Sequence, residues 1–250
     1  MVRKVLWTSG WDSTFRVLYS LIVDKVDVEP IYIIDNQRKS TLKELETMIK
    51  ISSLFNEKYP DLSEKLKPIT LINYELKKTK QYENNLKYLR ELPIKFGNQY
   101  AWLSVPLNKH ISTLENIEIS FQAGSSQTEF LKPYLYKLTT QDNYLILDSA
   151  PDNIRSLFGK YYFPLINLTK TDMKKISEKL GFYDLMLKTW FCHKPLIGMP
   201  CGSCNPCKDA RFKYNMKYRL SFISLYICPI FSFIRKPFIR LIYKKKHSLL

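Results

Sequence analysis

The sequence predicts an α/β protein built on a parallel sheet with helices on both faces. Within residues 4–55, short apolar runs typical of buried strands alternate with longer segments whose apolar residues recur at helical spacing. The chain has 250 residues, of which 45% are hydrophobic and 25% charged, as in a globular domain. Glycine occurs only seven times, which excludes collagen-like and glycine-linker architectures.

The amino-terminal part predicts two strand–helix pairs. Residues 4–7 form a short apolar strand that ends before Thr8, and residues 13–23 carry apolar side chains at helical spacing. Residues 30–34 predict the second strand and residues 41–55 the second helix. Strands that follow one another through crossover helices lie parallel in one sheet.

The middle of the chain predicts fewer elements. Residues 69–72 predict a third strand, and residues 100–111 a helix interrupted or restarted near Pro106. Residues 117–123 alternate apolar and polar side chains and stop at Gly124, which is typical of a strand followed by a loop.

The last predicted helix covers residues 173–180 and follows a helix cap at residues 169–172. Neither an internal repeat nor a low-complexity linker interrupts the sequence. We therefore expect residues 1–218 to form one domain and residues 219–250 a basic, apolar extension.

The net charge of +16 is unevenly distributed. Residues 208–250 contain 11 basic residues and one acidic residue, a net of +10, so the rest of the chain carries +6. A mildly basic body does not favour nucleic acid as a partner, whereas a basic, apolar tail suits an anionic membrane surface. The first apolar run is too short for a signal peptide, so we expect a cytoplasmic location, peripheral at the inner face of the membrane.

The segment after the first strand predicts a phosphate-binding loop. A helix begins there, and its unpaired backbone N–H groups and positive dipole end suit an anion. The alternative is that Ser and Asp serve as ordinary N-cap residues. The Walker pattern is absent. The loop consists of Thr8, Ser9, Gly10, Trp11, Asp12, Ser13 and Thr14.

Four cysteines, Cys192, Cys201, Cys204 and Cys207, predict a zinc site near the end of the domain. Two-residue gaps let a knuckle turn present thiolates to one tetrahedral ion, and four thiolates close its coordination shell, as in structural zinc sites. Gly202 stands where the turn needs a residue without Cβ. With four cysteines present, the neighbouring His193 is interpreted as a loop residue. In a reducing compartment, metal ligands are favoured over disulfides.

These motifs resemble known families. Residues 8–13 resemble the Ser-Gly-Gly-x-Asp-Ser pyrophosphate loop of the N-type ATP pyrophosphatases, with Thr for the first Ser and Ser for the first Gly. Residues 189–211 are similar to the carboxyl-terminal zinc motif of the 7-cyano-7-deazaguanine synthases, enzymes of queuosine precursor synthesis. Residues 35–38 with Glu44, and residues 164–172, resemble further segments of that family. The similarity spans about residues 4–213.

The resemblance implies a superfamily fold of the adenine nucleotide alpha-hydrolase type and an ATP-dependent ligase. In the family, ATP adenylates a carboxylate, ammonia displaces AMP to give an amide, and a second activation gives a nitrile. The implied cofactors are Mg²⁺ and Zn²⁺. The implied catalytic residues are Asp12, Ser13 and Lys170, with Lys170 and Arg211 binding phosphate charge. Alone, Lys170 is equally interpreted as a solvated lysine at a helix start. The implied ATP-binding residues are Thr8, Ser9, Gly10, Asp12, Ser13 and Thr14.

The region that reads the deazaguanine substrate in the family differs here. Asn98 and Gly124 correspond to family positions, but the family's Asp and Asp-Cys-Arg are missing. Three alternatives therefore stay open: an enzyme acting on another carboxylate, a tRNA-modifying or amidotransferase enzyme on the same scaffold, and a catalytically silent module at a membrane. A homodimer is compatible with each.

The extension contains an apolar run at residues 220–234, interrupted by Pro229 and short of a bilayer span. Basic residues at both ends and aromatic residues within it predict interfacial helices on anionic lipid. The alternative is a helix that packs on the body. Cys228 is interpreted as an apolar filler.

Overall fold

The computed structural model describes residues 2–35, 38–73, 79–105, 117–138, 143–196, 198–213 and 216–227. Predictions for Asn36, Gln37, residues 106–111 and the extension from Cys228 onward lie outside them. The strands are β1 (Val2–Leu6), β2 (Asp27–Ile34), β3 (Thr70–Asn73), β4 (Ile117–Glu118), β5 (Leu135–Lys137), β6 (Tyr144–Ile146) and β7 (Tyr161–Tyr162). The α-helices are α1 (Trp11–Ile22), α2 (Thr41–Lys58), α3 (Lys80–Glu91), α4 (Gln99–Leu103), α5 (Ser126–Leu131), α6 (Asp152–Phe158), α7 (Lys170–Lys179), α8 (Tyr183–Met186) and α9 (Asn205–Lys208). Shorter helical turns are η1 (Pro60–Lys65), η3 (Lys132–Tyr134), η4 (Asp209–Lys213), η5 (Lys217–Arg219) and η6 (Ile223–Ile227).

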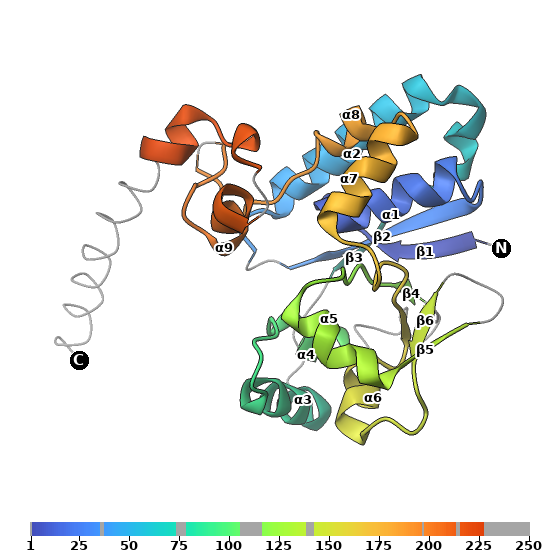
Figure 1. Cartoon of the computed structure of the whole chain (residues 1–250), viewed down its shortest axis with the longest axis vertical. Coiled ribbons are helices and arrows are strands. Elements are labelled where there is room, and N and C mark those ends of the chain that lie inside the picture. The colour runs from blue at the N-terminus through green and yellow to red at the C-terminus, as the bar shows by residue number, and fades with distance from the viewer. Residues whose placement is uncertain are drawn as a thin grey trace.

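A five-stranded parallel sheet with the order β3-β2-β1-β4-β7 forms the centre of the molecule (Figure 1). The chain moves outward from β1 to β2 and β3 on one side, and then to β4 and β7 on the other. This is a doubly wound order, and it confirms the predicted fold class. The loops that leave the carboxyl ends of β1 and β4 diverge, which opens a crevice at the point where ligands of such sheets bind.

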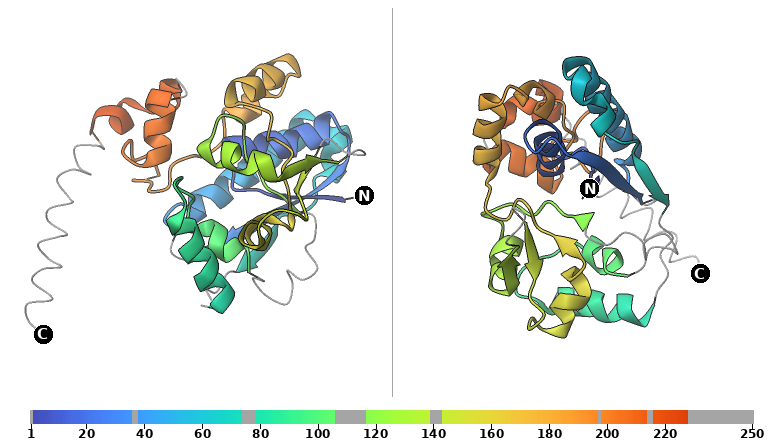
Figure 2. Two further views of the ribbon diagram at one scale, coloured as in Figure 1. Left: turned by 60° about the horizontal axis from the view of Figure 1, so that its bottom comes forward. Right: turned by 90° about the vertical axis from the view of Figure 1, so that its right-hand side faces the viewer.

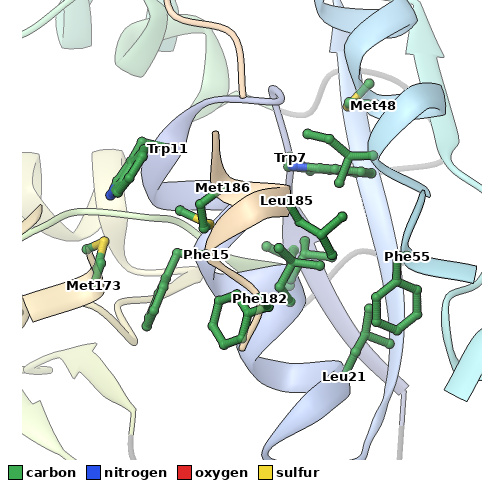
Figure 3. Packing of buried hydrophobic residues seen from close by; sticks show 14 of the residues in the cluster. Trp7, Trp11, Phe15, Leu21, Met48, Phe55, Met173, Phe182, Leu185 and Met186 are labelled. Carbon is green, nitrogen blue, oxygen red and sulfur yellow. The ribbon is translucent and has the colours of Figure 1, made fainter. Parts of the chain in front are cut away.

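Helices cover both faces of the sheet (Figures 1 and 2). On β2, alternate side chains enter opposite cores: Ile31 and Ile33 pack with α3, α4 and α6, whereas Tyr32 and Ile34 pack with α1, α2, α7 and α8. Figure 3 shows the second core, where Phe15 of α1 and Phe182 beside α8 meet. Trp7, at the end of the apolar run predicted as a buried strand, is fully buried there.

Most predicted elements of the first half are confirmed within a few residues at their ends. The strand expected at 117–123 is wrong in length, because β4 ends at Glu118. Beyond it the N–H of Phe121 donates to the carbonyl of Ile119, and Ala123 donates to Leu168, so the backbone turns away from the sheet toward the crevice. The helix expected at 100–111 begins as α4.

The predicted helix cap is confirmed. Thr169 accepts from the N–H of Asp172, whose carboxylate accepts from the N–H of Thr169 in return. This capping box fixes the start of α7, and therefore the position of Lys170, at the carboxyl edge of the sheet. No helix among the described residues is both long and apolar enough for a membrane span.

A buried ion pair joins α1 to the short strand β4. Arg16 Nε lies 2.5 Å from Glu118 Oε2, and Arg16 Nη2 donates to Oε1 at 2.7 Å. Asn143 Nδ2 donates to the same oxygen at 3.0 Å. Because Glu118 is almost inaccessible to solvent, these donors offset the cost of removing its carboxylate from water.

Candidate active site and metal centre

A cavity of about 480 Å³ lies in the crevice between β1 and β4. Its walls come from the loops that follow β1, β2 and β4, from the start of α7, and from segments on both sides of the cysteine cluster. Of the predicted loop, Thr8, Gly10, Trp11 and Asp12 line it. Lys170 lines it as well, so the structure brings this residue to the predicted loop.

The loop backbone takes the conformation that glycine favours. Ser9 has φ of 53°, in the left-handed region where a side chain is costly. Its carbonyl accepts from the N–H of Trp190 at 2.8 Å, and its buried Oγ has no hydrogen-bond partner among the described residues. The glycine-to-serine departure from the resembling family therefore falls at a strained position.

The amino-terminal end of α1 is open. Gly10 occupies the N-cap position in an extended conformation, and no side-chain hydrogen bond caps the helix. The alternative that Ser and Asp are ordinary N-caps is therefore wrong. Asp12 instead lies in the first turn, beside N–H groups that are free of intrahelical partners. Such an end suits a phosphate.

Two predicted binding residues lie beneath the loop. The Thr14 hydroxyl is fully buried and accepts from Trp7 Nε1 at 2.8 Å. Ser13 Oγ is 3.4 Å from both the Thr8 nitrogen and the Gly10 carbonyl. Neither residue lines the cavity, so both support the loop in this state.

Asp12 and Lys170 form an ion pair across the cavity, with Lys170 Nζ 2.5 Å from Asp12 Oδ1. Both side chains are only partly exposed. The alternative that Lys170 is simply a solvated lysine is therefore wrong. The pair places a cation and a carboxylate oxygen in the wall of the cavity that Gly10, the N-cap residue of α1, also lines.

Arg211, which was expected to bind phosphate charge beside Lys170, lies elsewhere. Arg211 does not line the cavity: it donates to the carbonyl of Leu225 at 3.2 Å and lies over the Phe212 and Tyr226 rings. Two other basic residues of the same segment, Lys213 and Arg219, line the cavity.

Arg219 is held firmly in the cavity wall. Its Nη2 donates to the carbonyl and, at 2.7 Å, to the hydroxyl of Thr189. Its guanidinium lies 4.8 Å from the Phe191 ring centroid and 5.5 Å from that of Trp11. Burial lowers the pKa of Arg219 to about 10, so it is cationic at neutral pH. Sequence analysis missed it because it is the first residue of the predicted extension.

The loop after β2 contributes Arg38 to the lining, and the first turn of α2 contributes Glu44. Arg38 Nη2 lies 3.0 Å from Glu44 Oε1. The Glu44 carboxylate also accepts from Ser40 Oγ at 2.7 Å and from the Tyr32 hydroxyl at 3.0 Å. Burial and the nearby carboxylate raise the pKa of Tyr32. Glu44 thus anchors the Arg38 guanidinium at the cavity wall.

One wall of the cavity carries no charged side chain. It is formed by side chains from α4 and from the segment that follows β4. Ser120 Oγ and, on the loop side, Trp11 Nε1 are buried polar atoms with no hydrogen-bond partner among the described residues. The lining of this wall includes Tyr100, Ser120, Phe121, Gln122, Ser125, Ser126 and Gln127.

The four cysteines meet in one cluster, with all sulfur atoms within 4.8 Å of one another. Cys204 Sγ lies 3.4 Å from Cys207 Sγ and 3.9 Å from Cys192 Sγ. Zn–S bonds of about 2.3 Å in a tetrahedron separate the sulfurs by about 3.8 Å, so the donor set fits one zinc ion. A four-iron cluster, in which each cysteine binds its own iron, holds its sulfurs further apart.

Backbone amides surround the cysteine sulfurs. The N–H groups of Cys201 and Lys194 donate to Cys192 Sγ at 3.2 and 3.4 Å, and that of Cys204 donates to Cys201 Sγ at 3.3 Å. Donation to Cys192 raises the pKa of the Cys207 thiol, and hydrogen bonds from neighbouring thiols lower the pKa of Cys204. A cation at the centre stabilises all four thiolates together.

The knuckle turn is as predicted, because Gly202 has φ of 68°. His193 lines the cavity but does not belong to the cluster of donor atoms. Burial lowers its pKa, and so does the neighbouring Arg38. The interpretation of His193 as a loop residue is consistent with this position.

Comparison with known proteins gives little for this chain. No protein-family profile matches it, and no curated protein matches it. Among solved structures it is similar to the U34-tRNA thiolase NcsA from Methanococcus maripaludis with its 4Fe-4S cluster. The two are 13% identical, with a TM-score of 0.44, over 91% of this chain and 70% of the other. Similarity at this level identifies neither a family nor an activity.

Proposed function

We propose that the protein is an enzyme of the N-type ATP pyrophosphatase kind, which adenylates a carboxylate and transfers the acyl group to ammonia. One observation carries the proposal: the open amino-terminal end of α1 and the Asp12–Lys170 pair face the same cavity at the switch point of the sheet. Anion-binding N–H groups, a cation and a carboxylate are what the pyrophosphate end of ATP requires.

Four of the cavity residues then have a role toward ATP. The N–H groups at the start of α1 hold phosphate oxygens, close to the backbone at Gly10. Lys170 and Arg219 balance the negative charge that develops when pyrophosphate leaves. The Asp12 carboxylate would hold Mg²⁺ together with phosphate oxygens, since this hard cation prefers oxygen ligands. When bound, Mg²⁺ supplies Lewis-acid polarisation of the phosphates.

The proposed reaction balances in two steps. A carboxylate oxygen of the substrate attacks the α-phosphorus of ATP, and the bond to the bridging oxygen breaks to release pyrophosphate. Ammonia then attacks the acyl carbon, AMP leaves with the C–O bond electrons, and the nitrogen loses a proton to give an amide. In the resembling synthases a second ATP activates the amide oxygen, and loss of AMP leaves a nitrile.

Zinc has a structural role in this proposal. Four thiolates leave no open coordination position for water or substrate. The cluster instead fixes the segment that runs from Trp190 to Arg219 along the cavity wall.

The neutral wall of the cavity gives information on the carboxylate substrate that would be adenylated. Tyr100, Ser125 and Gln127 offer an aromatic ring and neutral hydrogen-bonding groups, whereas the synthase family has an acidic residue in this region. This observation favours, as a second candidate, an enzyme that adenylates a carboxylate other than 7-carboxy-7-deazaguanine.

The experiment is to measure pyrophosphate release from ATP by the zinc-loaded protein with Mg²⁺ and ammonium, with and without 7-carboxy-7-deazaguanine. Release that depends on this acid, with a nitrile product by mass spectrometry, supports the synthase activity. ATP binding without that response keeps the adenylation proposal and redirects the search to other carboxylates. Absence of ATP binding refutes the proposal and leaves a silent module.

Variants make the test specific. Asp12→Asn is expected to abolish ATP turnover, because the variant lacks the negative charge that would hold Mg²⁺. Asp152→Asn is the matched control, since the Asp152 side chain is almost fully exposed on α6, outside the cavity lining. Equal turnover by the two variants contradicts the assignment.

A further inference from the structure

Large apolar side chains gather on the surface of the segment that follows the cysteine cluster. Phe212 is 72% exposed and Phe222 is 70% exposed, and four more apolar or aromatic residues nearby exceed one third exposure. Elsewhere in the described chain such side chains occur one or two to an element. We name the group the aromatic patch: Phe212, Tyr218, Phe222, Ile223, Tyr226 and Ile227.

The aromatic patch belongs to a folded surface. From the same segment, Leu220 is buried beside the cluster cysteines and Ser224 is fully buried. The Phe222 and Tyr226 rings lie 4.9 Å apart. The Arg211 guanidinium lies against the Tyr226 ring and donates to the carbonyl of Leu225. The segment therefore packs some of its side chains against the protein and still exposes its largest apolar side chains to solvent. Figure 1 shows it at one side of the molecule, away from the β5–β6 hairpin.

The basic residues around the aromatic patch indicate the kind of partner that binds there. Residues 208–227 contain five basic residues and one acidic residue, and residues 228–250 add six basic residues and no acidic one. Those last residues also carry aromatic and branched apolar side chains. Aromatic rings mixed with Lys and Arg are typical of the boundary between headgroups and acyl chains of an anionic bilayer.

We propose that the aromatic patch, continued by the basic carboxyl-terminal segment, docks the protein on an anionic lipid surface. The apolar side chains enter the headgroup–acyl boundary, and the Lys and Arg side chains contact lipid phosphates. This inference does not depend on the enzymatic proposal. The positive charge would also suit a nucleic acid, but the exposed isoleucines would not.

Co-sedimentation of the zinc-loaded full chain with vesicles tests the docking. Vesicles of phosphatidylcholine alone are compared with vesicles of equal parts phosphatidylcholine and phosphatidylglycerol. We expect binding to the anionic vesicles only, decreasing as salt is added. Protein that stays in the supernatant with both vesicles overturns the proposal, as does binding to tRNA without binding to vesicles.

Two double variants distinguish binding through the aromatic patch from nonspecific adsorption through any exposed apolar side chain. Phe222→Ser with Tyr226→Ser is expected to weaken vesicle binding about tenfold or more, because two exposed aromatic side chains no longer leave water. The matched control is Leu42→Ser with Ile49→Ser on α2, whose side chains are similarly exposed. Unchanged binding by the patch variant, or an equal loss in the control, contradicts the proposal.

A second variant set tests the charge. Replacing Lys244, Lys245 and Lys246 by glutamine is expected to reduce binding about fivefold for each charge removed. Circular dichroism and a zinc content equal to that of the parent confirm that these variants are folded. If sedimentation velocity shows that the patch is instead covered by a second copy of the chain, and vesicles do not dissociate it, the patch is a dimer interface and the proposal is wrong.

Discussion

Replacing Lys170 by methionine is expected to remove most ATP turnover and leave the fold intact. Lys170 Nζ lies 2.5 Å from Asp12 Oδ1, and the two side chains are 15% and 26% exposed. Coulomb attraction between unit charges at this distance is worth about 7 kcal/mol at an effective dielectric constant of roughly 20. Desolvation and side-chain ordering offset most of this in a partly exposed pair, so the free energy of unfolding should fall by no more than about 1 kcal/mol.

The catalytic loss is expected to be larger. In the proposed reaction this cation faces the charge that develops as pyrophosphate leaves, and removal of one such group costs about 10²- to 10³-fold in kcat. The assay is initial pyrophosphate release at saturating ATP and Mg²⁺, with urea unfolding measured on the same samples. The ratio of the two effects distinguishes a phosphate-binding lysine from a structural partner of Asp12.

Lys174→Met provides the control, because Lys174 lies one turn further along α7 and pairs with Glu178 at the surface. It should retain the parent kcat. If Lys170→Met also retains kcat within about threefold, against the 10²-fold loss expected, the pair merely stabilises the loop and the assignment of Lys170 fails.

Three further predictions concern stability and the metal. Glu118→Ala removes the two-point partner of the buried Arg16 guanidinium and leaves it Asp24 Oδ2, at 3.6 Å, so urea unfolding should show a loss of about 3–5 kcal/mol; a loss below about 1 kcal/mol contradicts this account of the buried pair. Burial lowers the pKa of Lys160 from 10.5 to about 8, so between pH 8 and 10.5 the unfolded chain binds more protons and stability from this group should rise with pH. Thermal denaturation of Lys160→Met across this range should lack that rise, and an identical pH profile would refute the assignment. Cys204→Ser should lose the bound zinc by atomic absorption and weaken ATP binding by calorimetry; retained affinity without metal would separate the two sites.

Local patterns predicted the first half of the fold because each element there is long enough to show its period. Helices α1 and α2 carry continuous apolar stripes, and β2 alternates cleanly between two cores. By contrast, β4 and β7 are only two residues long in the sheet. Glu118 in β4 also violates the apolar pattern, because its partner Arg16 comes from a distant part of the chain. A single sequence holds no local signal for such a pairing.

In the candidate site, too, local motifs predicted some residues, whereas others depend on the tertiary fold. The loop at residues 8–14 and the four cysteines were recognisable because each motif is contiguous or closely spaced. Arg219 was missed because its role depends on the path of the chain after the cysteine cluster, which returns it to Thr189. The exchange of Arg211 for Arg219 has the same origin: both are basic residues in one segment, and only the tertiary fold decides which of them faces the cavity.

Trp190 explains why the cysteine cluster and the loop belong to one site. Its N–H donates to the Ser9 carbonyl at 2.8 Å, and its indole Nε1 donates to the Cys192 carbonyl at 2.7 Å. The left-handed conformation of Ser9 costs about 1 kcal/mol or more and persists only where neighbouring contacts impose it. A metal that fixes Cys192 therefore fixes Trp190, and Trp190 holds the loop in its strained form. By this argument a structural ion would contribute to the proposed nucleotide binding without touching the nucleotide, because it would stabilise the backbone that presents the open end of α1.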